Sequence, residues 1–142
     1  MTQNATTNGG GVTIITAGSF TGSNSFNFNI TAPTPAQASS SGGVAGIALA
    51  NSSSTTATIS GNAALNITGV AYFPNAEFNA SGSSCNSSLP CFGTPSTTCL
   101  ELIASSILTT GNSNFNSNCS SLGGGTFTST AGTSTTTARV VH

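Results

Sequence analysis

Side chains that could support acid–base or nucleophilic chemistry are few in this sequence. Its charged residues are Glu77, Glu101 and Arg139, and its one histidine is His142. Glycoside hydrolysis needs two carboxyl groups about 5 to 10 Å apart, and we expect the two glutamates to be solvated strand residues instead. The many serines have no lysine or aspartate to activate them. We therefore predict no catalytic residue and no enzyme; the enzyme alternative is a polysaccharide hydrolase or lyase.

Cofactor and metal motifs are also missing from the sequence. The runs Gly9–Gly11 and Gly123–Gly125 lack the neighbouring residues of a phosphate-binding loop and are simpler to interpret as linkers or turns. Calcium loops of the Gly/Asp type need aspartate, which the sequence lacks. We predict neither a cofactor nor a metal site.

The four cysteines predict disulfides. Intervals of 5, 7 and 19 residues separate Cys85, Cys91, Cys99 and Cys119, and these fit no common zinc pattern. Disulfides imply an oxidising compartment. Four cysteines allow three pairings, of which we favour Cys85–Cys91 together with Cys99–Cys119.

The composition limits the classes of partner. The 142 residues suit one domain, and 2% of them are charged, against about 25% in typical soluble domains. Clustered Lys and Arg, which nucleic acids and anionic membranes require, are absent. A near-neutral surface repels other copies only weakly. The composition therefore favours association with itself or with other proteins.

Export signals are not evident at the start of the sequence. Residues 1–11 have neither a basic nor an apolar region of the kind that a signal peptide contains. No stretch approaches the roughly 18 apolar residues of a membrane helix. An oxidised protein without such a signal leads us to expect a fragment of a longer exported protein.

Short β-branched or aromatic runs between Gly, Asn, Ser and Pro predict strands throughout the chain. In Phe26–Ile30 the apolar residues alternate with asparagines, which predicts one buried and one exposed face. The predicted strands are Val12–Thr16, Ser25–Thr31, Gly43–Ala50, Thr55–Ser60, Ala64–Ile67, Val70–Phe73, Ala76–Ala80, Leu100–Ala104, Ile107–Thr109, Asn114–Asn118, Gly125–Ser129 and Thr136–Val141. We expect a flexible N-terminus at about residues 1–10 and loops at 32–43 and 82–98.

Internal similarity indicates how these strands are arranged. Ile67–Gly82 and Ile103–Asn118 both start with an aliphatic residue and end in a Phe-Asn strand. A repeated unit of short strands and Gly/Asn turns is typical of a parallel β-helix, or β-solenoid; the alternative is a β-sandwich. Stacked coils tolerate little charge and allow asparagine ladders, a role that suits the asparagines at 112, 114, 116 and 118.

The sequence has one candidate binding or turn motif, which consists of Tyr72, Phe73, Pro74 and Asn75. Strand alternation places one of the two aromatic residues inward and one outward. We expect core packing followed by a turn; the alternative is an exposed binding site for a sugar or protein.

The chain resembles the C-terminal region of TadG-like proteins of bacterial Tad (Flp) pilus-assembly systems. The resemblance covers nearly the whole chain and includes Asn66–Gly82 (NITGVAYFPNAEFNASG) and Leu102–Cys119 (LIASSILTTGNSNFNSNC). Its most specific pieces are NITG-x-x-YFPN at Asn66–Asn75 and the segment Cys99–Cys119, which starts Cys-x3-IA and ends TGNSNFNSNC. The resemblance implies an exported bacterial protein of the cell envelope or extracellular space. Family members usually have an N-terminal membrane helix, which this sequence lacks.

Three functions remain open at this point. The first is a non-enzymatic structural or adhesive module of a bacterial surface or pilus-associated assembly, which acts by self-association or by docking to other envelope proteins. The second is a binding module for glycans or ice, built on rows of Thr and Asn such as Thr133, Thr135 and Thr137. The third is the enzyme described above.

Overall fold

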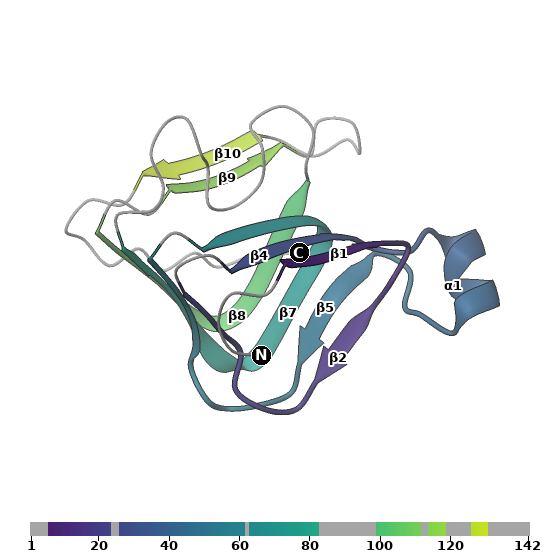
Figure 1. Ribbon diagram of the computed structural model, residues 1–142, viewed down its shortest axis with the longest axis horizontal. Helices are drawn as coiled ribbons and strands as arrows, with labels where there is room; N and C mark the ends of the chain where they lie inside the picture. Colours follow the sequence, from purple (N-terminus) through teal and green to yellow (C-terminus); the bar gives the residue numbers. More distant parts are fainter. Residues whose placement is uncertain are drawn as a thin grey trace.

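The computed structural model describes residues 6–23, 26–61, 63–82, 99–111, 114–118 and 126–130. Within these ranges the chain is built almost entirely of strands, with one short helix (Figure 1). The elements are β1 (Thr6–Gly10), β2 (Ile14–Thr16), β3 (Thr21–Gly22), β4 (Asn27–Thr31), α1 (Pro35–Ser41), β5 (Ile47–Asn51), β6 (Ala57–Ser60), β7 (Ala64–Gly82), β8 (Leu100–Gly111), β9 (Asn114–Asn118) and β10 (Thr126–Thr130).

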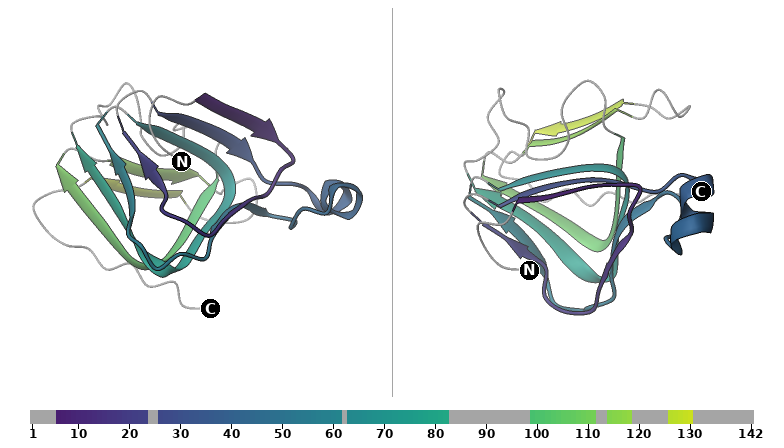
Figure 2. Two further views of the ribbon diagram at one scale, coloured as in Figure 1. Left: turned by 60° about the horizontal axis from the view of Figure 1, so that its bottom comes forward. Right: turned by 45° about the vertical axis from the view of Figure 1, so that its right-hand side comes forward.

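The first eight strands form one curled parallel sheet with three lines of pairing, which we call the first, second and third ladders. The first ladder joins β1, β4 and the start of β7. The second joins β2, β5, the middle of β7 and the start of β8. The third joins β3, β6 and the ends of β7 and β8. Figure 2 shows the strands curled around a three-sided interior.

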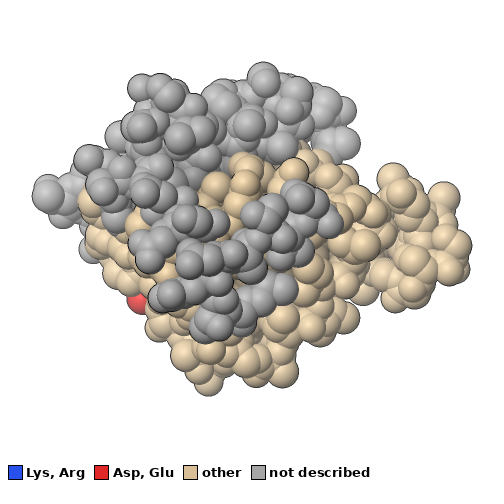
Figure 3. Space-filling view, in the orientation of Figure 1, with Lys and Arg blue, Asp and Glu red and all other residues tan. Residues whose placement is uncertain are grey.

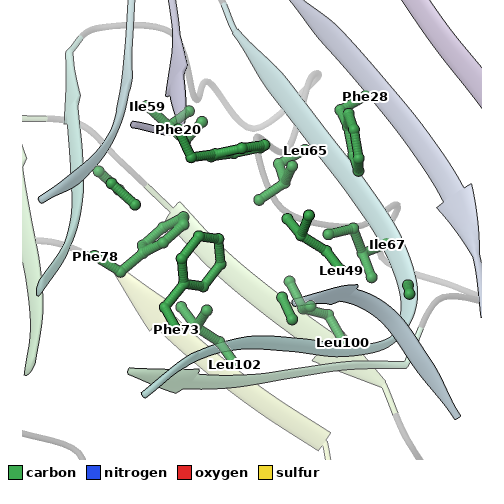
Figure 4. Close-up of a cluster of buried hydrophobic side chains, with 14 of the residues drawn as sticks. Phe20, Phe28, Leu49, Ile59, Leu65, Ile67, Phe73, Phe78, Leu100 and Leu102 are labelled. Atoms are coloured by element: carbon green, nitrogen blue, oxygen red, sulfur yellow. The ribbon is translucent and has the colours of Figure 1, made fainter. Parts of the chain in front are cut away.

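Phenylalanine and aliphatic side chains from all three ladders fill this interior (Figure 4). Phe20 makes edge-on ring contacts with Phe28 and Phe73, at centroid distances of 5.8 and 5.6 Å. Phe73 also packs against Phe78 at 5.4 Å. One aromatic cluster therefore ties the three ladders together, and edge-on pairs of this kind add to the free energy gained by burial.

Strand alternation decides which side chains enter the core. In β4 the phenylalanine and isoleucine are buried, whereas Asn27, Asn29 and Thr31 are exposed. The predicted alternation over Phe26–Ile30 is thus confirmed. It follows from the two-residue period of a strand with one buried face.

The prediction of a loop at 32–43 is wrong, because residues 35–41 form α1. The oxygen Oγ1 of Thr34 accepts a hydrogen bond from the backbone N–H of Gln37, and Oε1 of Gln37 accepts one from the N–H of Thr34. This is a capping box; Pro35 starts the helix and Gly42 ends it in the left-handed region. The helix buries no residue and projects away from the strands (Figure 1).

The prediction of a flexible N-terminus over residues 1–10 is wrong for residues 6–10, which form β1. This strand pairs in parallel with β4, from Thr6 opposite Asn27 to Gly10 opposite Thr31. A Cβ on Gly9 would lie 2.9 Å from Cγ2 of Val12 and 3.2 Å from Cδ1 of Ile30. Gly9 is therefore a packing residue of a strand and not part of a linker.

Three predicted strands, 64–67, 70–73 and 76–80, are parts of the single long strand β7. The repeat predicted from Ile67–Gly82 and Ile103–Asn118 is also stacked differently from that alignment, since Ile103 pairs with Tyr72 and not with Ile67. The register shifts between Phe73 and Glu77, where the strand passes from the second ladder to the third.

The prediction that the asparagines at 112–118 stack between coils is wrong for residues 114–118. These residues form β9, which pairs antiparallel with β10 in a separate two-stranded sheet. Asn114, Asn116 and Asn118 therefore follow one another along a single strand. Asn112 lies outside the described residues. In the first ladder, the backbone register places Asn8, Asn29 and Asn66 at the same position of three strands.

Candidate functional site: an exposed apolar row

The predicted aromatic motif lies in β7, where the second ladder gives way to the third. Phe73 is fully buried, and Tyr72 is 38% exposed. Pro74 has no backbone N–H with which to continue the ladder, and the register shifts here. Nδ2 of Asn75 donates a hydrogen bond to the carbonyl of Ser52 at 3.2 Å. The motif therefore presents Tyr72 alone as an aromatic contact residue, while Phe73 belongs to the core.

Tyr72 stands in a row of apolar residues that crosses four strands of the second ladder. Ile15 of β2 pairs with Ala50 of β5, Ala50 pairs with Tyr72, and Tyr72 pairs with Ile103 of β8. Residues in register in a parallel sheet point to the same face. We call Ile15, Ala50, Tyr72 and Ile103 the apolar row. Ile15 is 71% exposed, so the row faces outward.

Other apolar residues border this row. Ile47 and Val70 pair with each other in the next outward position of the second ladder, and Glu101 pairs with Val70. Val44 is 45% exposed, and its N–H donates to Oγ1 of Thr13 at 2.9 Å. Four large hydrophobic side chains are exposed in the described part of the chain, and each lies in the second ladder or within three residues of one of its strands: Val12, Ile15, Val44 and Tyr72.

Few charged residues lie near the apolar row. Glu77 and Glu101 are the two charged residues within the described ranges. The face drawn in Figure 3 shows one acidic spot and no basic residue among the atoms that are described. An uncharged apolar row loses less on leaving water than a charged surface would, which suits it to a protein–protein contact.

The outward face of the first ladder has a different character, because it is polar. Asn27, Asn29 and Thr31 are exposed, and Asn66 and Thr68 continue two of these positions in β7. Oδ1 of Asn66 is buried without a hydrogen-bond partner. Amide and hydroxyl side chains thus lie side by side on this face, and those on neighbouring strands are one strand spacing apart.

A buried asparagine fixes the corner between the second and third ladders. Asn51 is 2% exposed, and its Nδ2 donates to Oγ1 of Thr16 and to the carbonyl of Gly18, both at 2.8 Å. Its Oδ1 accepts from the N–H of Ser53 at 2.7 Å. All the polar groups of this side chain are engaged, so Asn51 is structural.

The two glutamates lie in different ladders. Glu101 pairs with Val70 in the second ladder, whereas Glu77 pairs with Ser106 in the third. Oγ of Ser106 donates to Oε2 of Glu77 at 3.4 Å. In the described part of the chain, no three histidine, cysteine, aspartate or glutamate residues form a group that could hold a metal ion.

Cys99 is disulfide-bonded, and its carbonyl accepts a hydrogen bond from the N–H of Gly69 at 2.7 Å. The other three cysteines, Cys85, Cys91 and Cys119, lie outside the described residues. The pairings Cys99–Cys119 and Cys85–Cys91 therefore stay predictions.

Several other predicted features also lie outside the described ranges. They are the strand Thr136–Val141, residues 83–98 of the predicted loop, the threonines Thr133, Thr135 and Thr137, and the terminal residues Arg139 and His142. No helix in the described ranges is both long and apolar enough to cross a bilayer.

Sequence reasoning missed Ile15, Ala50 and Ile103 as partners of Tyr72. One signal was available for Ile15: Ile14 and Ile15 are adjacent in a predicted strand, so alternation must turn one of them outward. The structure buries Ile14 further than Ile15. The row itself depends on the long-range register, which the sequence pattern does not contain.

Comparison of the chain with protein-family models, with curated proteins and with solved structures finds no match.

Proposed function

We propose that this chain is a non-enzymatic structural or adhesive module of a bacterial cell-surface or pilus-associated assembly. It acts by self-association or by docking to other envelope proteins. The observation that carries the proposal is the apolar row, which faces outward across four strands, with Ile15 and Tyr72 exposed, in a chain with a net charge of −1. Exposed apolar patches bordered by polar residues mark interaction sites.

The fold that fits this role best is a parallel β-solenoid. Three passes of the chain contribute to the first ladder and four to the second and third, and all eight strands of the curled sheet pair in parallel. A β-sandwich is normally made of antiparallel sheets, so the pairing favours the solenoid. Such folds offer long flat faces that suit repeated contacts.

An exported, extracellular or envelope location is part of the proposal. It is supported by the disulfide of Cys99, since structural disulfides persist in oxidising compartments. The bacterial surface and the pilus system come from the resemblance to TadG-like proteins, carried by segments that include Tyr72 and Asn75.

A charge placed in the apolar row tests this proposal. The double variant Ile15→Asp/Tyr72→Asp should weaken self-association at least tenfold and reduce retention on bacterial cells, because two carboxylates would have to leave water at the contact. Sedimentation velocity and a cell-retention assay measure the two effects. Both side chains are exposed, so the far-ultraviolet circular dichroism spectrum should not change.

The matched control is Asn27→Asp/Asn29→Asp, which adds the same charge to the exposed face of the first ladder. It should leave association and retention within twofold of the unmodified chain. Equal weakening by both double variants would mean that net charge and not the apolar row controls association, and the proposal would then fail.

The alternative function is a binding module for glycans or ice on the first ladder. It is favoured by the exposed Asn27, Asn29 and Thr31. Asn29 and Thr31 stand in register with Asn66 and Thr68. If this alternative holds, replacing Asn29 with Leu abolishes a thermal-hysteresis or glycan-array signal of the unmodified chain. The absence of any such signal from the unmodified chain would remove the alternative.

A further inference from the structure

An exposed carboxylate borders the apolar row. Glu101 of β8 pairs with Val70 of β7, and two residues farther along the same strands Ile103 pairs with Tyr72. Side chains two residues apart in a strand point to the same face. Glu101 and Tyr72 are both exposed on that face. The acid therefore belongs to the same surface as the apolar row.

The register sets the separation of Glu101 and Tyr72. They lie on neighbouring strands, which are about 4.8 Å apart, and are offset by two residues, each of which rises about 3.3 Å. Their Cα atoms are therefore about 8 Å apart. One long side chain from a partner can lie along the tyrosine ring and reach the carboxylate with its end. Val70 and Ile103, beside these two residues, offer aliphatic contacts to its stem.

The other glutamate is placed differently. Glu77 lies in the third ladder, is partly buried, and accepts a hydrogen bond from Oγ of Ser106 at 3.4 Å. Its carboxylate thus has a partner within its own chain. Glu101, in contrast, is the exposed acid that borders Tyr72, so it is the one that a protein docked on the apolar row must accommodate.

An aromatic ring, aliphatic side chains and one carboxylate together select a cationic side chain. The ring face attracts the ammonium group of lysine or the guanidinium group of arginine, and a carboxylate forms charge-assisted hydrogen bonds with either. The aliphatic stem of the same side chain packs on apolar neighbours. A wholly apolar segment would instead desolvate Glu101 without a counter-charge, which costs free energy.

The chain itself is a poor source of this cation. Its 142 residues include no lysine and one arginine, Arg139, whereas about 25% of the residues of a typical soluble domain are charged. A second copy therefore offers a single cationic side chain, and a different protein offers many. An anionic lipid surface would be repelled by the carboxylate.

We infer that the apolar row docks a different protein, whose contact segment sets a lysine or arginine side chain on Tyr72 and Glu101 among apolar residues. Opposite charges at such a contact select the partner and speed its approach. This inference rests on the proposed function, because it names the chemistry of the partner for docking to another envelope protein.

Reversing the charge of Glu101 tests the inference through retention on bacterial cells. Glu101→Lys takes the net charge of the chain from −1 to +1, so non-specific adsorption to an anionic cell surface should rise. The proposed contact instead loses its ion pair and sets like charges together, so retention should fall by about tenfold or more. The side chain is exposed, so the far-ultraviolet circular dichroism spectrum should not change.

Glu101→Gln and Glu77→Gln are the matched pair, because each removes one acid and takes the net charge to zero. The first should weaken retention by about threefold or more, and the second should leave it unchanged. Equal effects of the two glutamine variants overturn the inference, as does undiminished retention of Glu101→Lys. In either case the proposed function stands.

Two further measurements test whether the partner is a different protein. Cells whose surface proteins have been removed by protease before the chain is added should no longer retain it, whereas undiminished retention would point to a glycan or lipid and overturn the inference. Arg139→Gln should leave retention unchanged, and a loss as large as that of Glu101→Lys would assign the contact to a second copy instead. A chain that is neither retained on cells nor self-associates overturns the proposed function as well.

Discussion

Replacing Gly69 with Ala is expected to destabilise the protein by about 2–6 kcal/mol. Gly69 has φ +121°, a conformation that other residues rarely adopt. A Cβ there would lie 2.5 Å from Cβ of Ala32 and 2.8 Å from the carbonyl oxygen of Gly46. Neither atom can move without the backbone. Backbone strain and overpacking each cost about 1–3 kcal/mol, which gives the expected range.

The position of Gly69 explains this sensitivity. Its N–H donates to the carbonyl of Cys99, and the neighbouring Val70 donates to the carbonyl of Gly46. Three passes of the chain therefore meet at this residue.

Gly18→Ala is the control, since a Cβ there meets nothing within 4 Å and its φ is not positive. Urea unfolding should separate the two variants, and similar midpoints would contradict the structural role given to Gly69.

Replacing Phe73 with Ala is expected to lower the free energy of unfolding by about 3–5 kcal/mol, the usual cost of such a change in a core. The ring is fully buried and packs between Phe20 and Phe78, with centroids 5.6 and 5.4 Å away. It joins the second ladder to the third, so its loss leaves a cavity where the sheet turns.

The adjacent residue provides a control for this prediction. Tyr72→Ala removes a side chain of similar size from the outward face and should cost under about 1 kcal/mol. Chemical denaturation of both variants gives the comparison. A loss in Tyr72→Ala as large as in Phe73→Ala would mean that the outward face also carries the stability of the fold, which contradicts the apolar row as a surface free to bind.

The sequence predicted an all-β fold and the faces of individual strands because these depend on local alternation. Phe28 and Ile30 are buried, and the asparagines between and beside them are exposed. The same rule predicted that only one of Tyr72 and Phe73 would face outward. These are properties of a strand with one buried face, and they need no information about its neighbours.

Two errors came from treating local composition as if it determined structure. The Ser- and Pro-rich segment at 32–43 was predicted as a loop, although Thr34 and Gln37 have the spacing of a capping box. The glycines of residues 9 and 10 indicated a linker, yet Gly9 is small because Val12 and Ile30 occupy the space beside it. The capping box could have been recognised from the sequence, whereas the packing around Gly9 depends on the tertiary structure.

The stacking register could not be predicted in the same way. Thr6 pairs with Asn27, and Asn27 pairs with Ala64, so the second pass of the chain is longer than the first, because it includes α1. Insertions of this kind at the corners hide the repeat in the sequence. The apolar row follows from that register, which explains why this candidate surface emerged only from the structure.

Sedimentation velocity of the unmodified chain over a wide concentration range tests the central claim most directly. The account predicts reversible self-association as the concentration rises, or retention of the chain on bacterial cells. A chain that remains monomeric at every concentration, and that is not retained on bacterial cells, would contradict its role as a structural or adhesive module.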